Sequence, residues 1–153
     1  FTSIKNPGDL LMRGIALSLG LEAERFHQHG MADPLQLFRI FHYPPTTTGL
    51  PWGVGEHTDY GVLTILKSGG PGLQVKLLDG KWHDAPFLED AFIINLGDLM
   101  SRWTNDKWLS TPHRVVVLDA APGKDPLLAE RRQSMAYFCN LNMDAHVETI
   151  VHQ

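Results

Sequence analysis

Turn-forming residues recur at short intervals along most of this chain, and this spacing limits what the chain can fold into. From residue 53 onward, short apolar or alternating segments are each bounded by turn residues such as glycine, proline or aspartate. Asp79-Gly80 is the strongest of these signals, because this dipeptide favours a tight β-hairpin turn. The expected strands cover residues 61–66, 72–78, 81–85, 91–96, 110–118 and 132–141. Short strands without helices between them predict a mainly β fold, either a sandwich or a jelly roll.

The first 34 residues instead show helical periodicity. The cluster Asn6-Pro7-Gly8-Asp9 is typical of a helix start, and Gly20 is placed to end that helix. A second short helix is expected over residues 22–29, ended by Gly30. The apolar residues that recur at the spacing of the first helix are Leu10, Leu11, Ile15 and Leu19. The sequence thus predicts short N-terminal helices ahead of the β region.

Residues 35–43 change to strand-like alternation, with Leu37, Arg39 and Tyr43 on one face and Phe38 and Ile40 on the other. Because both faces are largely apolar, we expect a strand buried between two layers. Arg39 and Tyr43 are then either paired polar residues of the core or the lining of a cavity.

The composition is that of an ordinary soluble globular protein. The chain has 153 residues, 43% hydrophobic and 20% charged, which suits one domain with its own core. Its 13 Lys and Arg against 17 Asp and Glu argue against a nucleic-acid partner. No apolar run reaches membrane-span length and no signal peptide opens the chain, so we expect no membrane partner. The single cysteine, Cys139, favours a reducing compartment, and we expect a cytoplasmic monomer. Because the chain starts at Phe1 without an initiator Met, we also expect a fragment of a longer protein.

His57 and Asp59 form the core of a candidate metal site. On a strand, two side chains that are two residues apart project from one face. His113, which precedes a run of valines, is the best candidate for a third ligand. Alone, His113 would be interpreted as a core histidine, and an isolated His-x-Asp triplet is a weak signal. Together they favour the two-histidine, one-carboxylate site of non-haem Fe(II) oxygenases, which leaves coordination positions open.

Arg132 and Ser134 indicate a separate anion site. They share one face of the last predicted strand with Ala136 and Phe138, so a guanidinium and a hydroxyl rise from an apolar surface. Burial of an arginine without a partner is costly, so an anion is expected there. The alternative is a structural ion pair of Arg132, with Ser134 merely tolerated.

These segments together resemble the C-terminal catalytic domain of the 2-oxoglutarate/Fe(II)-dependent dioxygenases, including their isopenicillin N synthase-like branch. The matching stretches, in the family's order and at similar spacing, are His57-Thr58-Asp59, Asn95-Leu96-Gly97-Asp98, Thr104-Asn105, Ser110-Thr111-Pro112-His113-Arg114-Val115 and Arg132-Gln133-Ser134. The resemblance implies a double-stranded β-helix (jelly roll) with iron at one mouth of the barrel. It also implies a single catalytic domain over residues 1–153, with a helical lead-in over about 1–34 and a β core over about 35–143.

The resemblance further implies roles for individual residues. Arg132 and Ser134 would bind the distal carboxylate of the cosubstrate 2-oxoglutarate, and Tyr43 matches a tyrosine that assists this carboxylate. Phe41 departs from the family, which commonly has asparagine two residues before this tyrosine. The catalytic residues, which would also be the Fe(II) ligands, are His57, Asp59 and His113. With O2 as the other reactant, the implied reaction hydroxylates, desaturates or cyclises a small organic substrate and releases succinate and CO2.

Three alternatives stay open at this point. Arg132-Gln133-Ser134 also resembles the triplet of isopenicillin N synthase itself, an oxidase that does not use 2-oxoglutarate. The chain could instead be a non-catalytic jelly-roll module that keeps a metal for structure. A zinc hydrolase is the third alternative, since two histidines and an aspartate also hold Zn²⁺.

Overall fold

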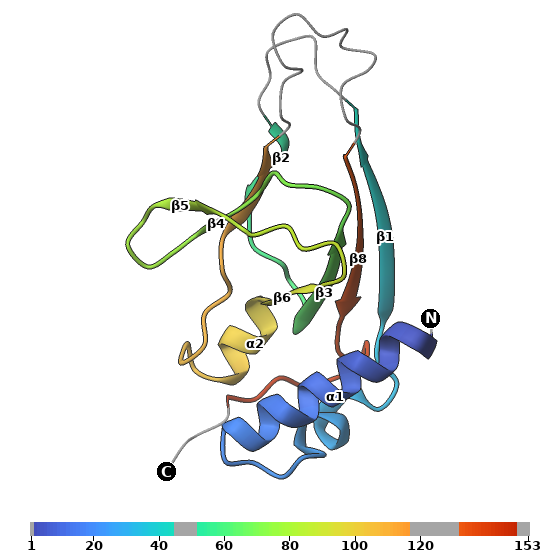
Figure 1. The fold of residues 1–153 in the computed structure, drawn as a ribbon. Helices are drawn as coiled ribbons and strands as arrows, with labels where there is room; N and C mark the ends of the chain where they lie inside the picture. The colour runs from blue at the N-terminus through green and yellow to red at the C-terminus, as the bar shows by residue number, and fades with distance from the viewer. Residues whose placement is uncertain (1, 45–51, 117–131, 150–153) are drawn as a thin grey trace, which may run out of the picture.

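Two four-stranded antiparallel sheets face each other in the computed structural model, which describes residues 2–44, 52–116 and 132–149 (Figure 1). One sheet has the order β1 (Gln36–Tyr43), β8 (Arg132–Cys139), β3 (Leu63–Ser68) and β6 (Ile93–Leu96). The other has the order β2 (Trp52–His57), β7 (His113–Val116), β4 (Leu73–Lys76) and β5 (Trp82–Asp84). The helical elements are α1 (Thr2–Ser18), η1 (His27–Met31) and α2 (Asp98–Trp103). The prediction of a mainly β jelly roll with N-terminal helices is therefore confirmed.

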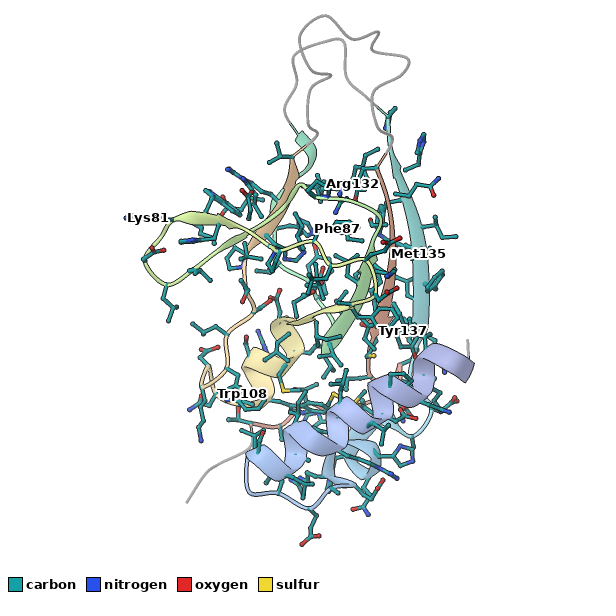
Figure 2. All side chains as sticks on the ribbon, in the orientation of Figure 1. Lys81, Phe87, Trp108, Arg132, Met135 and Tyr137 are labelled. Carbon is teal, nitrogen blue, oxygen red and sulfur yellow. The ribbon has the colours of Figure 1, made fainter. Side chains whose placement is uncertain are left out.

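The β1–β8–β3–β6 sheet uses its two faces differently. On β3, Leu63 and Ile65 belong to the main apolar core, which they form together with α1, η1 and α2. Figures 1 and 2 show α1 lying across one end of this sheet, next to Tyr137 of β8. Thr64 and Leu66, which alternate with the core residues of β3, line a cavity on the opposite face. The outer face of the sheet therefore packs into the main core, and the inner face lines the cavity.

The N-terminal helix begins earlier than the sequence pattern indicated. α1 starts at Thr2 and contains Pro7, where the helix start had been expected. Pro7 is the sixth residue of this helix, beyond the first four residues whose backbone N–H groups lack helical partners, so one helical hydrogen bond is missing there. Gly8 serves packing rather than initiation, because a Cβ at this position would lie 3.2 Å from the Sγ of Cys139. Burial raises the pKa of this thiol to about 12, so Cys139 is an unreactive core residue.

The second predicted helix is also shorter than expected. It is reduced to the π-helical segment η1, which is kinked at His29 and Gly30. The backbone φ of Gly30 is +138°, a conformation that favours glycine, so this residue interrupts the helix as its position suggested.

The expectation that β1 is buried between two layers is wrong. β1 is the edge strand of its sheet, paired only with β8 among the described strands. Ile40, on the face away from the cavity, is 69% exposed. A strand with apolar residues on both faces can be buried or can lie exposed at the edge of a sheet. Its own sequence does not distinguish the two, because the segments that would pack on it are distant in sequence.

Except for β2, for which no range was predicted, the remaining strands follow the predicted segments with different ends. β4 and β5 form the predicted hairpin, but β4 ends earlier and β5 begins later than expected, so residues 77–81 connect them. In this connection, Gly80 has a φ of +76°. Residues 117–118 of the predicted strand 110–118 lie outside the described residues. Within the described part of the chain, none of the helices is long and apolar enough to cross a membrane.

Candidate metal centre and its cavity

His57 and His113 are brought together by strand pairing. His57 is the last residue of β2, His113 is the first residue of β7, and the two are direct partners in the antiparallel register. Their ring centroids are 4.3 Å apart. Asp59 follows β2 by two residues, so it reaches the same place from a loop and not from the strand that the spacing had suggested. One ligand atom from each of these three side chains lies within 4.8 Å of the others.

The two imidazoles are oriented by their own backbone. The Nδ1 of His57 donates to the carbonyl oxygen of Gly55 at 2.8 Å, and that of His113 donates to the carbonyl oxygen of Thr111 at 3.0 Å. Because each Nδ1 carries the proton in such a bond, each Nε2 is free to act as a ligand. The Nε2 atoms lie 4.0 Å (His57) and 3.7 Å (His113) from the Oδ1 of Asp59. Three donor atoms therefore converge from one side on a common point.

The carboxylate of Asp59 is held through its other oxygen. Its Oδ2 accepts hydrogen bonds from the Oγ1 of Thr64 at 2.6 Å and from the Nδ2 of Asn95 at 2.8 Å. Oδ1 is thereby directed at the imidazoles. Residues that fix a metal ligand in this way raise its affinity for metal. The sequence pattern assigned no role to Thr64 or Asn95, although each is the one polar side chain of its predicted apolar segment, 61–66 or 91–96.

Replacement of Asn95 by alanine is therefore expected to weaken Fe(II) binding by about 10- to 100-fold, because Asp59 loses one of its two positioning bonds. Replacement of Thr64 by valine, which keeps the shape, should have a similar effect. Anaerobic Fe(II) titration would measure both.

A matched control for these variants is Asn142→Ala. The Oδ1 of Asn142 accepts a bond from the backbone N–H of Asp33 at 2.8 Å, far along the chain from the metal centre. This variant should lose some stability and keep its iron affinity. Equal iron affinity in all three variants would contradict the positioning role of Thr64 and Asn95.

Gly97 allows the turn before α2 to approach the loop that carries Asp59. A Cβ at Gly97 would overlap the carbonyl oxygen of Gly61 and would lie 2.8 Å from that of Asp59. The next residue, Asp98, donates its backbone N–H to the Asp59 carbonyl at 2.7 Å, and its Oδ2 accepts a bond from the Thr58 hydroxyl at 3.2 Å. Residues 95–98 therefore hold the loop that carries Asp59 in place.

Replacement of Gly97 by alanine is expected to destabilise the protein by about 1–3 kcal/mol or more, because the clashing atoms are backbone and cannot rotate away. The free energy of unfolding in urea would measure this. Gly14→Ala is the control: nothing lies within 4 Å of a Cβ there, and Gly14 is inside α1. That change should stabilise the protein by about 0.5–1 kcal/mol. Equal stability of the two variants would show that the close approach at Gly97 is unimportant.

The predicted anion-binding residues surround the other end of the same inner face. Arg132 pairs with Tyr43 across β8 and β1, and its Cζ lies 4.8 Å from the Tyr43 ring centroid. The Nε of Arg132 donates to the Pro71 carbonyl at 2.9 Å, and its Nη2 donates to the Ser68 hydroxyl at 3.1 Å. Its Nη1 is buried and has no partner among the residues that the structure describes. Figure 2 shows Arg132 at the end of β8, reaching into the space between the sheets.

The electrostatics of this end favour an anion. Burial lowers the pKa of the Arg132 guanidinium, while Tyr43 acts in the opposite direction. A buried arginine nevertheless keeps its charge at neutral pH. Ser134, 2% exposed, adds a hydroxyl to the same face. A carboxylate would balance the charge of Arg132 and accept a hydrogen bond from its Nη1.

All six predicted site residues line one cavity of about 370 Å³. This volume lies at the lower end of the range for small-molecule sites, which is about 300–1,000 Å³. Its walls are otherwise mostly apolar. They include Leu37, Phe41, Val54, Leu66, Leu73, Val75, Ile93, Val115, Ala136 and Phe138. The arrangement offers a candidate metal site, a candidate carboxylate site and a largely apolar space between them.

Comparison with known proteins agrees with this geometry. The 2OG-Fe(II) oxygenase superfamily matches residues 34–141, which is more than half of the chain. The chain belongs to this superfamily. The membership predicted from the sequence is thereby confirmed.

Individual known proteins are similar to most of this chain. A probable iron/ascorbate oxidoreductase of Dictyostelium discoideum is 46% identical over 125 residues, which cover 71% of this chain and 34% of that protein. A full-length Neurospora crassa protein, solved in complex with alpha-KG and thymine, has a TM-score of 0.85 and 36% identity, covering 96% of this chain and 45% of that one. JOX2 in complex with 2OG, Fe and JA has a TM-score of 0.84 and 28% identity, covering 96% of this chain and 42% of that one. The chain thus spans less than half the length of each of these 2OG-Fe(II) oxygenase relatives.

Proposed function

We propose that this chain is the catalytic part of a dioxygenase that depends on Fe(II) and 2-oxoglutarate. It would oxidise a small organic substrate by hydroxylation, desaturation or cyclisation, with release of succinate and CO2. One observation carries the proposal: three side chains that could hold a metal ion line the same cavity as a buried guanidinium, whose Nη1 has no partner among the described residues. The Neurospora crassa protein and JOX2, each crystallised with 2-oxoglutarate, support it.

The donor set suits ferrous iron. Two imidazole nitrogens and one carboxylate oxygen on one side of the metal leave the remaining coordination positions open toward the cavity. In this proposal His57, Asp59 and His113 hold the iron, and both histidines bind as neutral rings. Iron, 2-oxoglutarate and O2 supply the oxidising chemistry when bound. The chain itself orients the reactants and keeps water away from them.

Arg132, Ser134 and Tyr43 would seat the distal carboxylate of 2-oxoglutarate. A carboxylate between the Nη1 of Arg132 and the hydroxyl of Ser134 makes charge-assisted hydrogen bonds, which are stronger than neutral ones. Phe41, whose ring centroid lies 6.2 Å from that of Tyr43, makes this end more apolar than the asparagine common in the family. Low polarity strengthens the ion pair.

The domain organisation and partners follow from the same reasoning. We propose one catalytic domain over residues 1–153, with the helical lead-in up to about residue 34 and the β core over about 35–143. The partner would be a small molecule, not a nucleic acid or a membrane. The single cysteine favours a reducing compartment, and we propose a cytoplasmic monomer.

The decisive experiment uses the natural full-length protein. Fe(II) added to it without oxygen, in the presence of 2-oxoglutarate, is expected to give a visible metal-to-ligand charge-transfer band, and Zn²⁺ is expected to give none. Admission of O2 should then yield succinate. Absence of both the band and succinate would contradict the proposal. Substrate oxidation without succinate would favour the isopenicillin N synthase-like oxidase instead, and metal binding without either reaction would favour a non-catalytic module.

A further inference from the structure

Arg39 is a second guanidinium in the same cavity, and the proposed reaction assigns it no role. It lies on the inner face of β1, with Leu37, Phe41 and Tyr43, and lines the cavity. Its Cζ lies 5.9 Å from the ring centroid of Phe138. Within residues 2–44, 52–116 and 132–149, its guanidinium makes no hydrogen bond and no ion pair. The side chain is exposed, so the structure of the chain does not require its charge.

The position of Arg39 separates it from the 2-oxoglutarate end. Arg39 is opposite Ala136 on β8, whereas Arg132 is opposite Tyr43. Four residues along a strand correspond to about 13 Å. Arg39 instead lies near the level of the metal ligands, because Phe138 pairs with Thr64 and Thr64 bonds to Asp59. The guanidiniums of Arg39 and Arg132 therefore lie in different regions of the cavity, Arg39 near the metal ligands and Arg132 at the proposed 2-oxoglutarate end.

The charges in the cavity leave Arg39 without a counterpart. Among the described lining residues, the ionised side chains are Arg39, Arg132 and Asp59, with both histidines neutral as metal ligands. Under the proposed function, Fe(II) and Arg132 together carry three positive charges. Asp59 and 2-oxoglutarate together carry three negative charges. One positive charge, that of Arg39, then remains beside the space left for the substrate.

We propose that Arg39 binds the anionic group of the substrate, and that the substrate is a monocarboxylic acid with an apolar body. This inference rests on the proposed function. A single surplus positive charge matches a carboxylate better than a phosphate ester, which carries more than one negative charge at neutral pH. The fork of a guanidinium also matches a carboxylate in shape. The apolar body would pack against the neighbouring walls, which include Leu37, Val54 and Phe138.

Equilibrium binding tests this assignment without turnover. The full-length protein is loaded with Fe(II) and saturating 2-oxoglutarate without oxygen. Aromatic and aliphatic monocarboxylates, such as 3-phenylpropionate and hexanoate, are then titrated calorimetrically, each beside its own primary amide. We expect the acids to bind at least about tenfold more tightly than their amides, since an ionised hydrogen bond is replaced by a neutral one. Arg39→Gln should remove this difference, and Arg39→Lys should keep part of it.

Arg102→Gln is the matched control, because Arg102 is an exposed arginine on α2 outside the cavity. It should retain the preference for acids. Equal binding of acids and amides, no binding of either, or an unchanged preference in Arg39→Gln would overturn the inference. So would a loss of the charge-transfer band on addition of the acid, because the acid would then be displacing 2-oxoglutarate. A band that never forms defeats the proposed function instead, so the two failures are distinguishable.

Discussion

Replacement of His113 by alanine is expected to abolish the Fe(II)·2-oxoglutarate charge-transfer band and to lower turnover by more than about 100-fold. Loss of residues that merely support a ligand costs about 10- to 100-fold, so loss of a ligand itself should cost more. His113 Nε2 is one of only three donor atoms in the cluster. Asp59→Ala should have the same consequence. Anaerobic titration measures the iron affinity, and succinate formation measures the turnover.

The strands should survive this change. β7 pairs with both β2 and β4 through its backbone, which the substitution leaves in place. His42→Ala is the control, because His42 is an exposed imidazole on the face of β1 that points away from the cavity. It should bind iron and turn over normally. Full activity of His113→Ala would rule out the proposed ligand set.

Replacement of Arg132 by glutamine is expected to raise the dissociation constant of 2-oxoglutarate by at least about 30-fold, while iron affinity stays unchanged. Removal of one partner of a buried, hydrogen-bonded charge pair costs about 2–5 kcal/mol, and each 1.4 kcal/mol is tenfold in affinity. Because the metal ligands are untouched, a high concentration of 2-oxoglutarate should restore much of the turnover. The dependence of both the charge-transfer band and succinate formation on 2-oxoglutarate concentration would measure this.

The Arg132 variant also loses its bonds to Pro71 and Ser68, so a general loss of stability must be separated from a loss of binding. Arg114→Gln provides the comparison. Arg114 is a partly buried arginine of the other sheet that donates to Gln74 and lies over the Trp82 ring, outside the cavity. Its loss should cost stability without changing 2-oxoglutarate affinity. An unchanged dissociation constant in Arg132→Gln would contradict the anion site.

Local signals predicted most of the strands because turn and alternation patterns follow short-range rules, and the six predicted site residues, of which Tyr43 came from the family resemblance, line one cavity. Turn residues delimit strands, and alternation along β8 places Arg132 and Ser134 on one face with Ala136. The remaining features depend on contacts between distant segments. The bonds from Thr64 and Asn95 to Asp59 exist only because β3 and β6 lie side by side.

Two wrong expectations have the same origin. The exposure of β1 could not be deduced from its own residues, because an apolar pattern does not say whether another layer covers it. The start of α1 was misjudged because Pro7 and Gly8 are common helix-start residues. Here Gly8 instead permits contact with Cys139, more than a hundred residues later in the chain.

The metal centre draws its parts from both sheets: the imidazoles come from β2 and β7, and the donors that hold the carboxylate come from β3 and β6. An ion bound there would therefore cross-link the two sheets, which also meet through the apolar cluster around Tyr43, Leu73 and Val115. At a free ion concentration of about 100 times the dissociation constant, such binding stabilises the folded state by about 2.7 kcal/mol. Iron binding would thus raise the thermal stability of this protein as well as enable its chemistry. Removal of the iron by a chelator would weaken the contact between the two sheets first at the metal centre.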